Sequence, residues 1–148
     1  MQLFFIILPV IAIDQISKHI ITKCMIEGAS IPIINGFFHL TFIYNKGAAF
    51  GVLENQQWLF IAIAFLLIIL SYFFRKQINA SDSYLRYGIS TLLGGAIGNL
   101  IDRICLNKVV DFFDFIIWPV FNIADIAICV GVGMILWSIF QTDVLNNQ

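Results

Sequence analysis

Charged side chains stand inside or beside long apolar segments of this chain, where a charge is costly. Moving a charged side chain into the hydrocarbon of a bilayer costs on the order of 2.5–3.5 kcal/mol, so such residues usually have a partner or a function. We therefore expect these side chains to converge on one polar region near one face of a membrane. The residues concerned are Asp14, Lys18, Asp102, Arg103, Asp111, Asp114 and Asp125.

Asp111 and Asp125 are the candidates for chemistry, because they stand on different predicted elements. Asp111 follows the β-like pair Val109-Val110, and Asp125 stands at the start of an apolar span. Two carboxyl groups within a few ångströms of each other cannot both ionise, so they share a proton. The ionised member can take a proton from water while the protonated member polarises a substrate amide. Such a pair predicts an aspartic peptidase, whereas a single buried acid used for coupling or packing is the alternative.

The other charged residues have structural explanations that compete with a role in a site. Asp14 and Lys18 have the i, i+4 spacing of a pair within one helix, so Asp14 either forms that pair or supports the site. For Asp102 we favour a salt bridge that locks its helix. Asp114 is expected at the membrane surface, although it is also a rival to Asp111 as the first catalytic acid.

Lipid is the expected solvent of the chain, because its 148 residues are 60% hydrophobic and only 11% charged. Ordinary soluble domains are roughly 45–50% apolar and about 25% charged. The net charge is −1 and no basic stripe is present, so no nucleic-acid partner is expected. The scattered cysteines (Cys24, Cys105 and Cys129) and histidines (His19 and His39) have no metal-ligand spacing, so we expect no disulfide framework, metal or cofactor.

Four apolar segments predict a single all-α membrane domain over residues 1–148, with four transmembrane helices over residues 3–22, 58–74, 87–104 and 121–140. Each segment can cross a hydrocarbon core about 30 Å thick at about 1.5 Å per residue. The basic residues Arg75, Lys76 and Arg86 predict a cytoplasmic location for the second connection and for both termini. Other basic residues near the opposite face argue against this orientation unless they have another role: Lys18, Lys23, Lys46, Arg103 and Lys108.

The connection between the first two spans predicts a small β structure at the membrane surface. Residues 31–44 are rich in β-branched and aromatic side chains around Asn35-Gly36, a pair typical of a tight hairpin turn. Residues 47–51 predict a short interfacial helix.

Five motifs occur in order along nearly the whole chain. They are Asp14-Gln15-Ile16-Ser17-Lys18, Asn45-Lys46-Gly47-Ala48-Ala49-Phe50, Gly94-Gly95-Ala96-Ile97-Gly98-Asn99-Leu100-Ile101-Asp102-Arg103, Val109-Val110-Asp111-Phe112 and Phe121-Asn122-Ile123-Ala124-Asp125. Each motif alone is weak, but in this ordered set the sequence resembles the lipoprotein signal peptidases (signal peptidase II) of bacteria.

The resemblance implies a four-span enzyme of the bacterial cytoplasmic (inner) membrane, with an extracytoplasmic β-cradle, a short interfacial helix and a metal-free Asp dyad near the outer face. The implied reaction is hydrolysis of the signal-peptide bond before the diacylglyceryl-modified cysteine of a prolipoprotein. That substrate and membrane lipids are the implied partners. Matched motif by motif, the catalytic residues are Asp111 and Asp125, and the substrate-binding or site-supporting residues are Asp14, Asn45, Asn99, Arg103 and Asn122.

Two other classes of function account for some of the same features. A small proton- or cation-coupled membrane transporter also carries acids in its spans, but it favours acids near the midplane and paired or interrupted helices. A non-catalytic membrane subunit would leave each charged residue with only the structural role given above.

Overall fold

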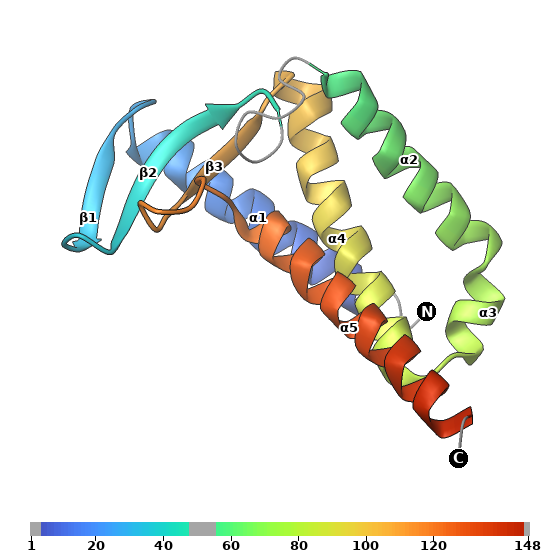
Figure 1. The fold of residues 1–148 in the computed structure, drawn as a ribbon. Coiled ribbons are helices and arrows are strands. Elements are labelled where there is room, and N and C mark those ends of the chain that lie inside the picture. Colours follow the sequence, from blue (N-terminus) through green and yellow to red (C-terminus); the bar gives the residue numbers. More distant parts are fainter. Residues whose placement is uncertain (1–3, 48–55, 147–148) are drawn as a thin grey trace.

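A computed structural model describes residues 4–47 and 56–146 of the chain. The long helices form a bundle, and a small sheet stands at the end where α1 ends and α5 begins (Figure 1). In chain order the elements are α1 (Phe4–Cys24), β1 (Ser30–Ile34), β2 (Phe38–Asn45), α2 (Gln57–Phe73), α3 (Arg75–Ala80), α4 (Ser83–Leu106), β3 (Val109–Asp114) and α5 (Ile123–Asn146).

Three helices in the described part of the chain are long and apolar enough to cross a membrane: Phe5–Cys24, Ser83–Leu106 and Ile123–Thr142. The apolar helix α2 is shorter, with 17 residues. Large apolar side chains such as Ile13, Phe65 and Trp137 are exposed on the outer surfaces of the helices, as expected where lipid is the solvent. The predicted helical membrane fold is therefore confirmed, with three candidate spans by length and a fourth apolar helix.

Helix α4 is the centre of the bundle, because α1, α2 and α5 all pack against it. Its contact surface contains glycines, which let membrane helices approach closely. A Cβ atom added at Gly98 would meet the Asp14 carboxylate at 2.6 Å, and one added at Gly95 would collide with the carbonyl oxygen of Ala124. The absence of side chains here brings the polar residues of α1 and α5 against α4.

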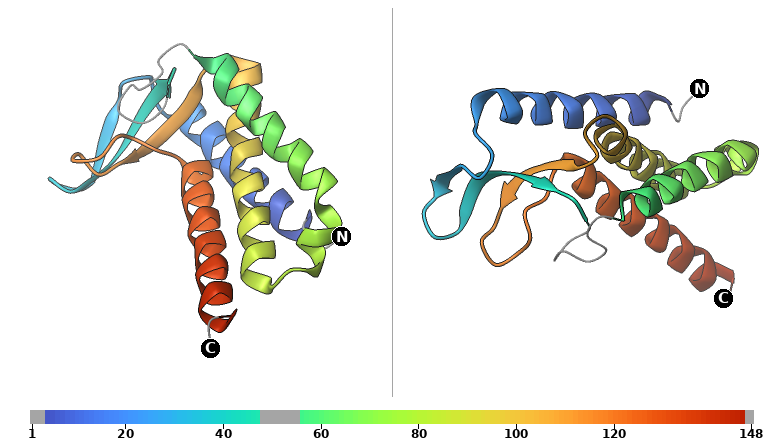
Figure 2. Two further views of the ribbon diagram at one scale, coloured as in Figure 1. Left: turned by 45° about the vertical axis from the view of Figure 1, so that its right-hand side comes forward. Right: turned by 90° about the horizontal axis from the view of Figure 1, so that it is seen from above.

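The sheet is antiparallel, with the strand order β1-β2-β3, and it projects beyond the helices (Figure 2). Strands β1 and β2 form the predicted hairpin, and Gly36 in its turn has the left-handed φ of 72° that favours glycine. An apolar cluster fixes the sheet to the end of α1. It consists of Ile21, Phe42, Val110 and Phe112.

Two features of the connections differ from the sequence predictions. The β-like pair before Asp111 is the start of a complete strand, β3, which forms one edge of the sheet. The connection after α2 contains the unpredicted helix α3. The predicted interfacial helix over residues 47–51 lies, apart from Gly47, outside the described residues.

Helix α4 begins before the apolar segment that predicts it, because Asp82 caps it. The Asp82 Oδ1 atom accepts hydrogen bonds from the backbone N–H groups of Tyr84 at 2.8 Å and Leu85 at 3.1 Å. A capping carboxylate satisfies N–H groups that have no partner within the helix. The cap therefore extends α4 towards α3.

Candidate active site

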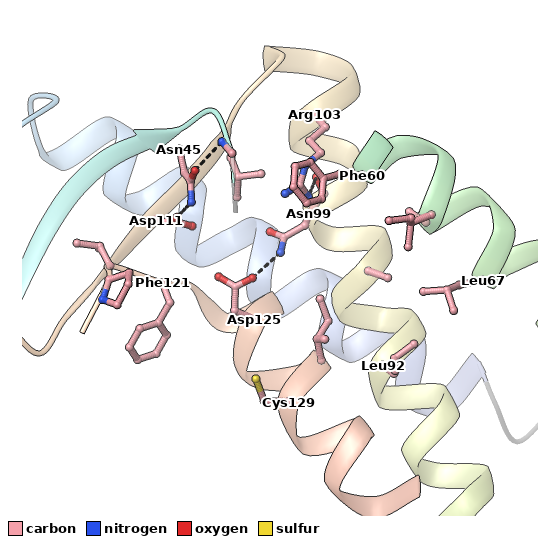
Figure 3. Close-up of a pocket in the computed structure, with 18 of the residues that line it drawn as sticks. Asn45, Phe60, Leu67, Leu92, Asn99, Arg103, Asp111, Phe121, Asp125 and Cys129 are labelled. Atoms are coloured by element: carbon pink, nitrogen blue, oxygen red, sulfur yellow. Dashed lines mark hydrogen bonds between the residues drawn. The ribbon is translucent and has the colours of Figure 1, made fainter. Parts of the chain in front are cut away.

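A cavity of about 410 Å³ lies between α2, α4 and α5, next to the sheet. Most of its wall is apolar, and polar side chains gather at the end near β2 and β3 (Figure 3). The fold thus brings together residues that are far apart in the sequence. The polar residues of the wall are Asn45, Asn99, Arg103, Asp111 and Asp125.

Asp111 reaches the cavity from β3, where it lies opposite Ile43 of β2. The residue is 1% exposed, and its carboxyl group accepts hydrogen bonds from Asn122 Nδ2 at 2.6 Å and Asn45 Nδ2 at 2.9 Å. Burial, followed by the negative charge of Asp125, raises the pKa of Asp111 to about 7. The group can therefore hold a proton at neutral pH, where an ordinary aspartate is ionised.

Asp125 lies in the first turn of α5. Its carboxylate accepts hydrogen bonds from Asn99 Nδ2 at 2.8 Å and from the backbone N–H of Asn122 at 3.1 Å. The first turn is also the positive end of the helix dipole, which stabilises a carboxylate. These contacts hold Asp125 at the polar end of the cavity, on the same side as Asp111 (Figure 3).

Backbone contacts fix the orientation of two asparagine amides at this site. Asn122 Oδ1 accepts a hydrogen bond from the backbone N–H of Asp125 at 3.0 Å, and Asn45 Oδ1 accepts one from Gly47 at 2.8 Å. An amide whose oxygen is engaged in this way presents its N–H donors on the other side. Asp111 therefore faces two donors that cannot become acceptors without breaking a bond to the backbone.

A buried ion cluster centred on Lys18 lies beside the cavity. The Lys18 ammonium is 2.9 Å from Asp14 Oδ2 and 3.0 Å from Asp102 Oδ2, and it donates to Asn99 Oδ1 at 2.9 Å. Buried charges are stable only when they are paired and hydrogen-bonded. The pair predicted within α1 is present, and the predicted salt bridge of Asp102 joins α4 to α1.

The two carboxylates of this cluster also hold the backbone next to the two acids of the cavity. Asp14 Oδ1 accepts a hydrogen bond from the N–H of Ala124 at 2.9 Å, one residue before Asp125. Asp102 Oδ2 accepts one from the N–H of Val110 at 3.1 Å, one residue before Asp111. The cluster therefore positions α5 and β3 relative to each other.

Arg103 lines the cavity and has an unpaired hydrogen-bond donor among the described residues. Its guanidinium carbon is 4.6 Å from the centroid of the Phe60 ring, and Nη1 is 3.5 Å from the carbonyl oxygen of Asn99. Its buried Nε atom has no hydrogen-bond partner within the described part of the chain. Stacking on Phe60 fixes the plane of the guanidinium, so the Nε–H group can donate to a bound molecule.

Asp114, the rival of Asp111, has a different environment. Its carboxylate accepts hydrogen bonds from Thr41 Oγ1 at 2.6 Å and from the backbone N–H of Ile116 at 2.7 Å. The Thr41 hydrogen bond is the main reason that the pKa of Asp114 lies below its usual value. Asp114 is not part of the cavity wall, so Asp111 is the acid that accompanies Asp125 there.

Comparison with known proteins identifies the family. A family model described as "Signal peptidase (SPase) II" matches residues 6–141. A lipoprotein signal peptidase of Moorella thermoacetica is 42% identical over 139 residues, which cover 94% of this chain and 93% of that protein. The chain belongs to the signal peptidase II family. A lipoprotein signal peptidase of Brevibacillus brevis is 43% identical over 142 residues, which cover 95% of each chain.

Solved structures agree with this membership in the signal peptidase II family. A structure described as a bacterial membrane enzyme superposes with a TM-score of 0.90 at 34% identity, over 99% of this chain and 92% of that one. A second bacterial membrane enzyme has a TM-score of 0.78 at 37% identity, over 93% and 92% of the two chains. The predicted family is confirmed, and membership makes the chain a bacterial membrane protease of lipoprotein processing rather than a transporter.

Gln15 is a residue of this signal peptidase II fold that sequence reasoning missed. Its Nε2 donates to Asp102 Oδ1 at 3.0 Å, to the carbonyl oxygen of Gly98 at 3.1 Å and to Asp14 Oδ2 at 3.2 Å. A signal was available, because Gln15 and Lys18 are i, i+3 neighbours and so share one face of α1.

Proposed function

We propose that the chain is an aspartic endopeptidase that hydrolyses the signal-peptide bond before the diacylglyceryl-modified cysteine of bacterial prolipoproteins. Asp111 and Asp125 are the catalytic pair. The observation that carries this proposal is that Asp111 and Asp125 both line the polar end of a largely apolar cavity, where burial and the charge of Asp125 raise the pKa of Asp111 to about 7. A pair that shares one proton near neutral pH provides both an acid and a base for amide hydrolysis.

The pair supports hydrolysis in two steps. First, the ionised acid takes a proton from water, whose oxygen attacks the amide carbonyl carbon, while the protonated acid gives its proton to the carbonyl oxygen. The intermediate carries two hydroxyl groups. Second, the carbon–nitrogen bond breaks as the acid that received the water proton passes it to the nitrogen, and one hydroxyl returns its proton to the other acid. The products are a carboxylic acid and an amine, and the pair again holds one proton.

The surrounding polar residues position these groups. Asn122 and Asn45 hold the Asp111 carboxyl group, and Asn99 holds that of Asp125. Arg103 is the donor proposed for substrate carbonyl oxygens, because its Nε, in the wall of the cavity, has no partner among the residues that the structure describes. Asp14 acts at a distance, through its hydrogen bond to the α5 backbone.

The apolar wall of the cavity supports a lipid-modified substrate. It is built by side chains that include Phe60, Ile63 and Leu67 of α2, Leu92 of α4 and Ile128 of α5. A wall of this kind can receive a signal helix and acyl chains from the bilayer, while the few polar groups at one end orient the bond to be cleaved.

For the topology, we propose four transmembrane helices in one domain of residues 1–148, with both termini in the cytoplasm. Helix α2 has 17 residues, which rise about 26 Å at about 1.5 Å each and so lie at the lower limit for a span. Arg75, Lys76 and Arg86, in the connection from α2 to α4, favour the cytoplasmic side. The acids and the sheet, at the other end of the bundle, then lie near the outer face.

Local contacts account for three of the basic residues that argued against this orientation. Lys18 belongs to the buried ion cluster, and Arg103 stacks on Phe60. The Lys108 ammonium lies 3.3 Å from the centroid of the Tyr44 ring. Side chains with such partners are placed by the fold, so they do not oppose the charge bias of the other loop.

Single and double Asn variants of the pair test the mechanism. Asp111→Asn and Asp125→Asn should each lower cleavage of a diacylglyceryl-modified prolipoprotein by about 10²–10⁴-fold or more, the effect of losing a general acid or base. The double variant should be little worse than either single variant, because the two residues act as a unit. Asp114→Asn is the matched control and should retain most activity, since its carboxylate lies outside the cavity wall.

Folding of each variant is checked by thermal unfolding in the same detergent. If folded Asp111→Asn cleaves normally while Asp114→Asn is inactive, the first acid is misassigned. If Asp111→Asn and Asp125→Asn both cleave normally, the aspartic mechanism is wrong.

Cysteine labelling tests the topology. The native residues Cys24, Cys105 and Cys129 are first replaced by serine, because all three are exposed. A single cysteine is then placed at Asn79 in α3 or at the exposed Glu27 near the sheet. A membrane-impermeant reagent added to spheroplasts should label the Glu27 position only, and labelling of the Asn79 position only would reverse the orientation.

A further inference from the structure

A second cavity, of about 450 Å³, lies at the same end of the bundle as the sheet. The start of α2 and the end of α4, which Figure 1 shows side by side, form most of its wall. Asn45 and Gly47, the neighbours of Lys46, line the first cavity, so the two cavities adjoin. The residues that line the second cavity are Lys46, Gln57, Trp58, Leu106, Asn107 and Lys108.

The Gln57 side chain is buried at this cavity. The residue is only 6% exposed, and neither Nε2 nor Oε1 has a hydrogen-bond partner among residues 4–47 and 56–146. Buried polar groups nearly always have partners, because an unsatisfied one destabilises the fold. An amide left unsatisfied in a cavity wall points to a ligand that supplies the missing hydrogen bond.

Gln57 is also the first residue of α2, whose first-turn N–H groups form the positive end of the helix dipole. The N-cap residue makes no side-chain hydrogen bond to the helix, and none of residues 57–60 is acidic. The Gln56 side chain, at the N-cap position, instead accepts a hydrogen bond from Trp58 Nε1 at 2.8 Å. The N–H groups of a first helical turn lack intrahelical acceptors and favour an anion.

Two lysines add positive charge to this wall. The Lys108 ammonium stacks on the Tyr44 ring, a cation–π contact that limits its movement at the cavity. Lys46 is exposed and also lines the cavity. None of the described residues lining this cavity is acidic. The described part of the wall therefore presents amines, amides and helix N–H groups but no carboxylate.

We propose that this cavity binds the phosphodiester group of a membrane phospholipid. Its donors are those that proteins use for phosphate oxygens. The position of the cavity relative to the membrane favours a lipid over a free ion, because α4, a candidate membrane span, ends at this cavity. Trp58, 66% exposed beside it, belongs to a residue type that gathers at membrane interfaces.

Binding measurements on the full-length protein in a non-ionic detergent test this site independently of cleavage. The probes are dihexanoyl phosphatidylglycerol, dihexanoylglycerol, which has the same chains without phosphate, and inorganic phosphate. Calorimetry and the rise in unfolding temperature report binding. The phospholipid should bind saturably and more tightly than either inorganic phosphate or dihexanoylglycerol. Equal binding of the two diacyl probes would overturn the phosphate assignment, and equal binding of phosphate and phospholipid would overturn the lipid assignment.

Variants place the binding at this cavity. Gln57→Leu removes the unsatisfied amide, so the variant should unfold at a higher temperature without lipid, yet bind the phospholipid about tenfold more weakly. Lys108→Gln should weaken binding to a similar extent. Lys23→Gln is the matched control, since Lys23 is exposed at the end of α1 and does not line the cavity. Unchanged affinity in both Gln57→Leu and Lys108→Gln, or equal weakening in Lys23→Gln, would overturn the proposal.

Discussion

Lys18→Met should destabilise the protein and lower its activity, although Lys18 is not part of the wall of the first cavity. The change removes the ammonium that lies 2.9 Å from Asp14 and 3.0 Å from Asp102, and it leaves two buried carboxylates without a cation. Removing one partner of a buried ion pair costs about 3–5 kcal/mol. At about 1.4 kcal/mol per factor of ten, the ratio of folded to unfolded protein should fall by roughly 10²-fold or more.

The charge balance of the cluster predicts an order among its variants. One cation faces two anions in the native cluster, so Asp102→Asn leaves a balanced pair and should cost less than Lys18→Met. In the double variant Lys18→Met/Asp102→Asn, Asp14 no longer faces a second carboxylate. The double variant should therefore lose less stability than the sum of the two single losses, by about 0.5–3 kcal/mol.

Thermal unfolding and cleavage kinetics, measured on the same detergent preparations, test this reasoning. Because Asp14 and Asp102 hold the backbone beside Asp125 and Asp111, kcat should fall by a larger factor than KM rises in the folded variant. Lys23→Met, an exposed position on the same helix, is the matched control. A Lys18→Met protein that unfolds at the native temperature, or a Lys23→Met protein that is equally damaged, would refute the reasoning.

Further predictions concern pH, close packing and metal. Folding raises the pKa of Asp111 from 3.8 to about 7, so the folded state binds more protons than the unfolded state between these pH values. The contribution of Asp111 to the free energy of unfolding therefore falls as pH rises from about 4 to about 7. Asp111→Asn should remove that slope from a stability–pH profile, and parallel profiles for the two proteins would contradict the raised pKa. Gly98→Ala should destabilise the protein by about 1–3 kcal/mol, since the added Cβ would lie 2.6 Å from the Asp14 carboxylate. Gly133→Ala is the control: its Cβ meets open space, so the variant should unfold at the native temperature or higher. Cleavage should continue in the presence of a chelator, because no three His, Cys, Asp or Glu side chains in residues 4–47 and 56–146 could together hold a metal. Loss of activity in chelator that zinc alone restores would contradict this prediction.

The features of the fold that could be predicted are those encoded locally. Long apolar segments indicated the helices, and the Asn35-Gly36 pair indicated the hairpin, because each signal lies within the element that it specifies. The pairing of β3 with β2 could not be predicted in this way, since strand pairing depends on tertiary context. The cap at Asp82 was also missed, because the apolar pattern begins only after the first turn of α4.

The site follows the same division between local and long-range information. The Asp14–Lys18 pair could be predicted from its spacing, but the partner of Asp102 could not, because it lies on another helix. The ambiguity between Asp111 and Asp114 came from not assigning β3 its full length. Side chains alternate along a strand, so these two acids point to opposite faces of the sheet, and only one can face the cavity.

The Asp14–Lys18 pair lies within a single helix, and α1 is synthesised long before α4. When a ribosome delivers α1 to the membrane, Asp102 has not yet been made. An ion pair at i, i+4 needs no second helix, so the two charges can neutralise each other during insertion, when an isolated charge would be most costly. The excess negative charge enters the bilayer only with α4, and Lys18 is by then in place to receive it. The order of these residues along the chain thus matches the order in which their charges must be neutralised during membrane insertion.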